Sequence, residues 1–353
     1  MKKNRGLYIH IPFCTHLCSY CDFSKLLYDK DLVKRYLDEL NLELHERKIK
    51  DITSIYIGGG TPTSLDEEEL EYLLKMIDEF FIEGISYTIE ANVENLTPNK
   101  IKILKKHGIN RISLGVQTFD DNLLKLINRF HSYNDTKRVI NEIVDNGIND
   151  INIDLIYGLP LEDMNLLKKD LDIAMTLPLT HISTYSLMIN KNTKMYIDGW
   201  KEKDEDEIRK MYDYIVSYLK EHGFNRYEVS NFSKDGYESK HNLIYWHNEE
   251  YYGVGLGASG YIDGIRYTNT KSINKYLNHM RNYESEILKE DDICFYDVML
   301  GLRLKEGILE NKIINKEKMN ELIRRNLLVR CENRIRVNDE YLFILDYILK
   351  ELL

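Results

Sequence analysis

The chain has 353 residues, of which 43% are hydrophobic and 30% are charged, and its formal net charge is −10. This composition is typical of a soluble globular protein with room for one large and one smaller domain. The acidic balance argues against a nucleic-acid binder, no apolar run approaches the roughly 20 residues that span a bilayer, and the polar N-terminus is unlike a secretory signal.

Strand-like and helix-like segments alternate through the first two thirds of the chain. Short apolar runs predict strands at residues 7–11, 54–57, 86–91, 111–115, 151–156 and 181–185. Helical spacing of apolar residues predicts helices at residues 31–47, 64–81, 98–107, 122–126, 134–145, 164–175 and 205–222. Ser64 and Glu67 have the spacing of a capping box. Six strand–helix units predict an α/β fold with a parallel sheet, best described as a partial six-unit (β/α) barrel, although a doubly wound sheet is also compatible.

The pattern changes after Gly223. Short strands around glycine-rich turns are expected at residues 227–229, 252–256 and 261–267, and helices at 272–283 and 291–302. A helix at 315–326, a hairpin at 328–337 and a helix at 339–353 resemble a winged-helix unit, but acidic and basic residues balance there, which favours a structural or docking role over DNA binding. We therefore divide the chain into residues 1–223, a β-rich linking region 224–285 and a C-terminal domain 286–353.

Three of the five cysteines lie together after the first predicted strand. Cys14, Cys18 and Cys21 have the spacing C-x3-C-x2-C, and soft thiolates so placed suit an iron–sulfur cluster or zinc. Three ligands would leave one iron of a cubane open, which usually means chemistry or substrate binding. No disulfide framework is indicated, so a reducing cytoplasm is the expected setting, with Cys294 and Cys331 as buried small hydrophobes.

Small or polar residues follow the other predicted strands. In α/β barrels the loops at the carboxyl ends of the strands build the active site, and glycine lets a ligand approach the backbone. The residues concerned are Gly59, Gly60, Thr61, Glu90, Gln117, Arg129 and Asp154. Together with the cysteine loop they predict one ligand site.

These motifs resemble the radical S-adenosylmethionine (SAM) superfamily: the cysteine loop has Tyr20 before its last cysteine, and residues 58–62 read Gly-Gly-Gly-Thr-Pro. The resemblance implies that Cys14, Cys18 and Cys21 hold a [4Fe–4S] cluster, and that SAM binds the fourth iron. It also implies an electron donor, whose electron lets the reduced cluster cleave SAM to a 5′-deoxyadenosyl radical. At the matching positions, the residues expected to contact SAM are Tyr8, Tyr20, Gly59, Gly60, Thr61, Glu90, Gln117, Arg129 and Asp154.

Within that superfamily, residues 8–14, 58–63, 114–119 and 154–160 resemble the branch of oxygen-independent coproporphyrinogen III dehydrogenases and HemW-type haem chaperones. The dehydrogenase motif has a fourth cysteine where this chain has Phe23, and a longer N-terminal arm. The H-N-x-x-Y-W motif at residues 241–246 and the segment 226–232 before it match the haem-chaperone group.

The resemblance thus implies haem as a ligand, with His241, Tyr245 and Trp246 as site residues, since imidazole ligates haem iron and aromatic faces pack on porphyrins. His247 is an alternative ligand, the motif could instead brace the cluster domain, and the role of His10 is open. The predicted function is haem delivery to an unidentified acceptor protein, with peripheral membrane contact possible. The alternatives are radical decarboxylation of coproporphyrinogen III and, third, a radical methyltransferase or other tailoring enzyme.

Overall fold

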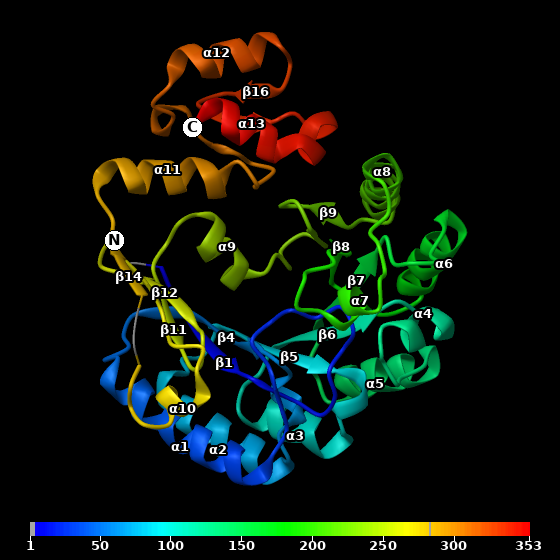
Figure 1. Ribbon diagram of the computed structural model, residues 1–353, viewed down its shortest axis with the longest axis vertical. Coiled ribbons are helices and arrows are strands. Elements are labelled where there is room, and N and C mark those ends of the chain that lie inside the picture. The colour runs from blue at the N-terminus through cyan, green and yellow to red at the C-terminus, as the bar shows by residue number, and fades with distance from the viewer. Residues whose placement is uncertain (1–3, 282–283) are drawn as a thin grey trace.

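Residues 4–281 and 284–353 are described here in a computed structural model, shown in Figure 1. The principal sheet has 12 strands. Its centre is formed by β1 (Arg5–Ile11), β4 (Ile52–Gly59), β5 (Ser86–Asn92), β6 (Arg111–Gln117), β7 (Asp150–Tyr157) and β8 (His181–Ser186). These six strands are parallel neighbours in chain order, which confirms the six-unit partial barrel. A doubly wound sheet would reverse its order at one strand, so that alternative is excluded.

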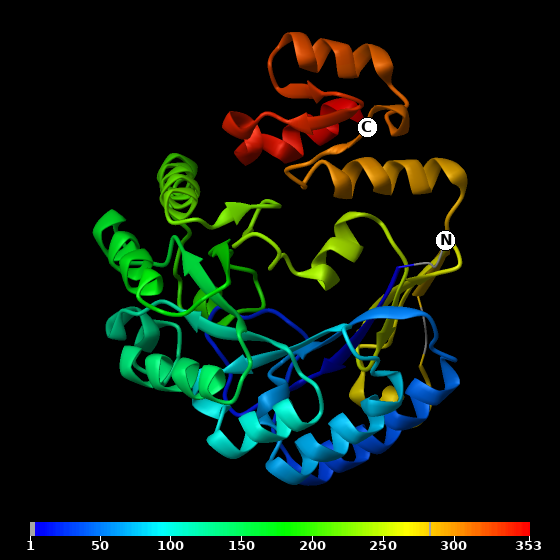
Figure 2. The same cartoon turned by 180° about the vertical axis from the view of Figure 1, so that it is seen from behind.

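Helices connect these strands and lie along the outer side of the curved sheet (Figures 1 and 2). They are α1 (Lys30–Glu46), α2 (Glu67–Ile77), α3 (Pro98–Lys106), α4 (Asp121–Leu126), α5 (Tyr133–Asp145), α6 (Met164–Met175) and α8 (Glu205–Glu221). Because side chains alternate along a strand, β1 buries Leu7, Ile9 and Ile11 in the apolar core and turns Tyr8 and His10 to the other face. One face of the sheet therefore packs in the apolar core, and the opposite face presents polar side chains such as those of Tyr8 and His10.

The predicted start of α2 was wrong. Pro62–Ser64 forms a short 3₁₀ turn, and the capping box is made by Asp66 and Glu69 rather than by Ser64 and Glu67. The helix ends at Ile77 and continues as a 3₁₀ turn, Asp78–Phe80, so it is shorter than expected. The helix cap therefore lies at Asp66, two residues after the predicted cap Ser64, and Pro62, with its fixed φ, begins the 3₁₀ turn that precedes the helix.

Residues after Gly223 extend the principal sheet at both edges. Beyond β8 lie β10 (Asn231–Ser233) and β9 (Asn225–Arg226); beyond β1 lie β11 (Tyr251–Val254), β12 (Ser259–Ile262), β13 (Ile265–Thr268) and β14 (Glu284–Ile287). The strand expected at 227–229 is instead the turn between β9 and β10, and residues 261–267 belong to two strands. Of the helix expected at 272–283 only α10 (Ile273–Tyr276) forms, and residues 282–283 lie outside the described part of the chain.

The H-N-x-x-Y-W motif lies on a helix, α9 (Lys240–Trp246), within the region expected to be rich in strands. Ser239 begins this helix by accepting a hydrogen bond from the Asn242 backbone N–H. A second short helix, α7 (Lys194–Ile197), follows β8. In Figure 1, α9 faces α11 (Glu290–Gly301) on one side and the sheet on the other. The motif therefore sits between the sheet and the C-terminal elements.

The C-terminal elements form a three-stranded antiparallel sheet flanked by helices. They are β15 (Ile308–Leu309), α12 (Lys316–Arg324), β16 (Leu328–Cys331), β17 (Arg334–Val337) and α13 (Leu345–Leu352), which begins after a 3₁₀ turn, Asp339–Ile344. The predicted hairpin is confirmed. Cys331 is exposed and Cys294 is half-buried, so the expectation that both are buried was wrong. Within residues 4–281 and 284–353, no helix has the length and apolar character needed to cross a membrane.

Candidate cofactor site

The cysteine loop leaves β1 and is held at its base and its middle. Two short parallel strands, β2 (Phe13–Cys14) and β3 (Leu26–Leu27), bracket the loop. The segment after α4 holds its middle: the Ser19 N–H donates to the Ile127 carbonyl at 3.1 Å, and Asn128 Nδ2 donates to the Leu17 carbonyl at 2.7 Å. All three cysteines of the loop line one cavity of about 850 Å³.

These cysteines fit an iron–sulfur cluster. Burial raises the pKa of the Cys14 thiol to about 11, so a thiolate there needs a neighbouring cation, which iron would supply. In the described ranges no three His, Cys, Asp or Glu side chains are grouped to bind a single metal ion. A cubane presents its irons at separate corners, so its thiolates lie farther apart than the ligands of one ion. Three soft thiolates on one short loop are the ligand type that iron–sulfur clusters use.

The same cavity gathers most of the residues expected to contact SAM. Its lining includes Tyr20, Gly59, Gly60, Thr61, Glu90, Gln117, Arg129 and Asp154. Tyr8 is not brought into this lining: its hydroxyl is 2.9 Å from His10 Nδ1, and His10 Nε2 is 3.1 Å from the Ser24 carbonyl. Tyr8 and His10 thus brace the far end of the cysteine loop, while a contact between Tyr8 and SAM stays a prediction.

An irregularity at the end of β6 gives Gln117 its position. The pairing of β6 with β7 shifts register between Gly115 and Gln117, and Gln117 has a φ of 72°. A Cβ added at Gly115 would lie 2.9 Å from Asn92 Oδ1 and 3.0 Å from Gln117 Nε2, so glycine allows both amides to approach. Bulges and left-handed residues of this kind collect at functional sites, where they redirect a side chain.

Glu90 lies deep in the cavity with both carboxylate oxygens engaged. Tyr56 donates its hydroxyl to Oε1 at 2.8 Å, and the Gly59 N–H donates to Oε2 at 3.0 Å. Burial raises the pKa of Glu90 to about 7. Burial also raises the pKa of Asp154, which Asn152 contacts at 2.8 Å. Both carboxyl groups are therefore held where a bound ligand's hydroxyl or ammonium groups could favour the ionised form.

The affinity for SAM should therefore rise with pH around neutrality. If Glu90 accepts hydrogen bonds from SAM, its pKa of about 7 makes it about one tenth ionised at pH 6 and about nine tenths at pH 8. We expect up to about tenfold tighter SAM binding at pH 8, measured by calorimetry on the anaerobic cluster-loaded protein. Glu90→Gln should flatten this profile. A wild-type profile that weakens towards pH 8 would contradict the assignment.

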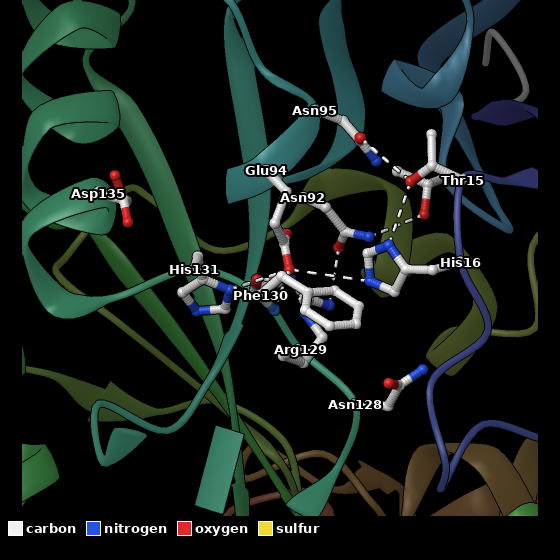
Figure 3. Close-up of polar contacts among 12 residues, drawn as sticks. Thr15, His16, Asn92, Glu94, Asn95, Asn128, Arg129, Phe130, His131 and Asp135 are labelled. Carbon is white, nitrogen blue, oxygen red and sulfur yellow. Dashed lines mark hydrogen bonds and ion pairs between the residues drawn. The ribbon is translucent and has the colours of Figure 1, made fainter. Parts of the chain in front are cut away.

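Arg129 is part of a buried network, shown in Figure 3. Its Nε and Nη2 donate to the two carboxylate oxygens of Glu94 at 3.0 and 3.1 Å. Its Nη1 donates to Asn92 Oδ1 at 3.0 Å, and Nη2 also donates to the Gly115 carbonyl at 2.6 Å. The guanidinium is therefore fixed in one orientation at the wall of the cavity, and its charge is balanced by Glu94.

Glu94 joins this network to the cysteine loop. His131 Nδ1 and the Phe130 N–H both lie 3.2 Å from Glu94 Oε1, and His16 Nε2, from the turn between Cys14 and Cys18, lies 3.8 Å away (Figure 3). Burial alone would raise the pKa of Glu94, but the neighbouring His131 and Arg129 hold it far below its usual range. The sequence alone does not single out Glu94; its only signal is an acidic residue just after a strand end.

The H-N-x-x-Y-W motif does not line this cavity. His241 is buried, with Nδ1 2.8 Å from Ser54 Oγ and Nε2 2.7 Å from the Tyr245 hydroxyl. Its ring stacks on Tyr56, the residue that donates to Glu90, at a centroid distance of 5.2 Å. These contacts favour the bracing role for His241. Haem ligation by His241, with Tyr245 and Trp246 against the porphyrin, stays a prediction.

Known proteins share both this fold and these motifs. Residues 8–173 match the Radical SAM superfamily. A protein of Lactococcus lactis named heme chaperone HemW is 39% identical, over 96% of this chain and 95% of its own length. The protein of the same name from Bacillus subtilis is 38% identical, over 88% and 86%. The structure of coproporphyrinogen III oxidase (HemN) from Escherichia coli superposes with a TM-score of 0.86 at 20% identity, covering 99% of this chain and 90% of that one, which shows a common fold.

Similarity to the two HemW proteins spans far more of the chain than the superfamily match does. It therefore includes elements beyond the barrel, among them the region of the H-N-x-x-Y-W helix. Membership of the radical SAM superfamily implies a [4Fe–4S] cluster and SAM as cofactors, in keeping with the cysteine loop and its cavity. The chain belongs to the HemW family of the radical S-adenosylmethionine superfamily.

Proposed function

We propose that this protein is a haem chaperone, which binds haem and passes it to an acceptor protein. The observation that carries the proposal is its similarity to two proteins named heme chaperones over 96% and 88% of the chain. Phe23 supports it from the site, because this side chain lies on the cavity lining, 69% exposed, where the dehydrogenase motif has a further cysteine. The cavity therefore lacks a thiol expected of the porphyrinogen-oxidising branch.

Cys14, Cys18 and Cys21 would hold the [4Fe–4S] cluster, and the other residues of the cavity lining would hold SAM. When bound, these cofactors supply the capacity for reductive cleavage of SAM. Glu90 and Asp154 would accept hydrogen bonds from ribose hydroxyls or the ammonium group, and Arg129 would face a carboxylate. Thr61 Oγ1, 3.7 Å from Cys14 Sγ, would hold the edge of the cluster site.

The proposed setting is the cytoplasm, where thiols stay reduced. The proposed partners are haem, an acceptor haemoprotein and an electron donor for the cluster, with peripheral membrane contact where the acceptor is membrane-bound. Nucleic acid is not a proposed partner, because the chain carries a net charge of −10.

The competing function is radical decarboxylation of the propionates of coproporphyrinogen III. We expect anaerobic, cluster-loaded protein given SAM, a reductant and coproporphyrinogen III to form no protoporphyrinogen IX, because the function proposed here is haem transfer. The Escherichia coli oxidase serves as the positive control and Cys14→Ser as the cluster-free background. Product formation clearly above that background, measured by chromatography, would reverse the ranking of the two functions.

A further inference from the structure

A chain of buried hydrogen bonds runs from Asp154 to the start of α9. Asn152 Nδ2 donates to Asp154 Oδ1 at 2.8 Å, and Asn152 Oδ1 lies 2.6 Å from His181 Nδ1. His181 Nε2 lies 2.9 Å from the Tyr227 hydroxyl, and that hydroxyl accepts the Ser239 N–H at 3.3 Å. Asn152, His181 and Ser239 are all buried. A carboxylate expected to contact SAM is therefore connected to the residue that begins α9.

The donors and acceptors of this chain are consistent with one direction. Because Asn152 Nδ2 donates to the carboxylate, Oδ1 is left as an acceptor, and His181 must carry its proton on Nδ1. Nε2 is then an acceptor and takes the hydroxyl proton of Tyr227. Burial lowers the pKa of His181 well below its usual range, in keeping with a neutral ring. Each hydrogen bond therefore points towards Asp154, and donors aligned in this way stabilise its ionised form.

Glu90, the second buried carboxylate of the cavity, is also connected to α9. Tyr56 donates to Glu90 Oε1 at 2.8 Å, and its ring stacks on His241 of α9 at a centroid distance of 5.2 Å. His241 is held in turn by Ser54 and by Tyr245, at 2.8 and 2.7 Å. This connection shares no residue with the first chain. Two separate routes therefore link the cavity to α9, which lies between the sheet and the C-terminal elements (Figure 1).

We propose that α9 positions the SAM site through these two routes. Tyr227 and Tyr56 are the positioning residues, because each joins α9 to one of the carboxylates that would contact SAM. The backbone carbonyl of Tyr227 also accepts the Lys305 N–H at 2.9 Å, so the segment after α11 is attached to the same residue. Coupling between two sites is reciprocal: a partner that moves α9 or the C-terminal elements would change SAM affinity, and bound SAM would stabilise one position of α9. This inference concerns the SAM site and goes beyond haem transfer.

The other titratable groups around the two carboxylates keep their charge near neutral pH. Burial lowers the pKa of His241 to about 3, so its ring stays neutral. Arg111, which faces Asp154, stays charged. A pKa raised by desolvation keeps the surrounding tyrosines protonated; they are Tyr8, Tyr20, Tyr56, Tyr185 and Tyr245. A difference between variants in the pH dependence of SAM affinity therefore reports the ionisation of Glu90 and Asp154.

Calorimetric SAM titration of the full-length, cluster-loaded protein at several pH values tests this inference. Tyr227→Phe keeps the ring but removes the hydroxyl that the chain needs, and Tyr56→Phe does the same beside Glu90. Each change weakens the hydrogen bonding that favours an ionised carboxylate. We therefore expect SAM binding about three- to tenfold weaker at neutral pH, with the rise in affinity displaced to higher pH. The matched control is Tyr276→Phe, which removes a buried hydroxyl that donates to Glu43 at 2.8 Å, away from the cavity lining, and should change neither property.

A double-mutant cycle shows whether Tyr227 acts through Asp154. In Asp154→Asn protein, adding Tyr227→Phe should change SAM affinity by less than about twofold, because the carboxylate on which it acts is absent. An equal loss of affinity in both backgrounds would overturn the inference. Folded Tyr227→Phe and Tyr56→Phe proteins with wild-type affinity and pH dependence would also overturn it, as would an equal loss in Tyr276→Phe. Thermal denaturation establishes that each variant is folded before its affinity is compared.

Discussion

Glu94→Ala should lower the stability of the protein by about 3–5 kcal/mol, because it leaves the Arg129 guanidinium buried without its counter-charge. The Arg129 side chain is 1% exposed and Glu94 accepts two of its hydrogen bonds. The same change frees His16 and His131 from their shared carboxylate. Urea denaturation of the cluster-free protein measures this loss without contributions from cofactors.

The same substitution should also weaken SAM binding. Once Arg129 can turn away from the cavity, we expect SAM affinity to fall at least tenfold in cluster-loaded Glu94→Ala. Glu94→Gln keeps the shape of the side chain, so its SAM affinity and stability should lie between those of the wild-type protein and those of Glu94→Ala. The matched control is Glu310→Ala, because Glu310 also accepts two hydrogen bonds from an arginine, Arg330, but on the surface, where such pairs are worth about 0–1 kcal/mol. Equal destabilisation by Glu94→Ala and Glu310→Ala would refute the structural role of the network.

Cys18→Ser should abolish cluster incorporation. A cubane held by three thiolates cannot readily exchange one of them for a hydroxyl, so iron should fall from about four atoms per chain to a small fraction of that number. Iron and sulfide analysis after anaerobic reconstitution measures the loss. Because Cys18 lies on a loop tied down by the backbone of Ser19 and the side chain of Asn128, the apo-protein should keep its fold.

The control for that experiment is Cys331→Ser, at an exposed cysteine on β16 far from the loop in sequence. It should load iron and sulfide as the wild-type protein does. Cys18→Ser protein that still bound about four irons per chain would overturn the ligand assignment.

The barrel and the cysteine loop could be predicted because their signals are local. Each parallel strand is a short apolar run buried against helices. Once the strands are recognised, their positions in the sequence show that Glu90 and Asp154 lie towards the carboxyl ends of β5 and β7. Parallel strands then bring those residues together at one edge. This is why eight of the nine predicted SAM contacts, all but Tyr8, lie on one cavity lining with the cysteines.

The features that could not be predicted depend on contacts between distant segments. His241 is buried with both ring nitrogens in polar contacts, one with Ser54, 187 residues away in the sequence, and one with Tyr245. Arg129 and Glu94 are 35 residues apart, and nothing in the local sequence around either residue indicates that they form an ion pair. Strands β9–β14 contain few residues each, so their own sequences give little signal. Their positions depend on pairing with the two edges of the six-stranded parallel sheet, at β1 and at β8.

The central claim is that this protein carries haem and releases it. The most direct measurement loads the protein with haemin, removes unbound haem by gel filtration, and adds an excess of an apo-haemoprotein while the visible spectrum is recorded. We expect about one equivalent of haem to stay with the protein through the column and then to pass to the apo-haemoprotein. Protein that leaves the column without haem, or that keeps its haem against the excess of acceptor, would contradict the claim.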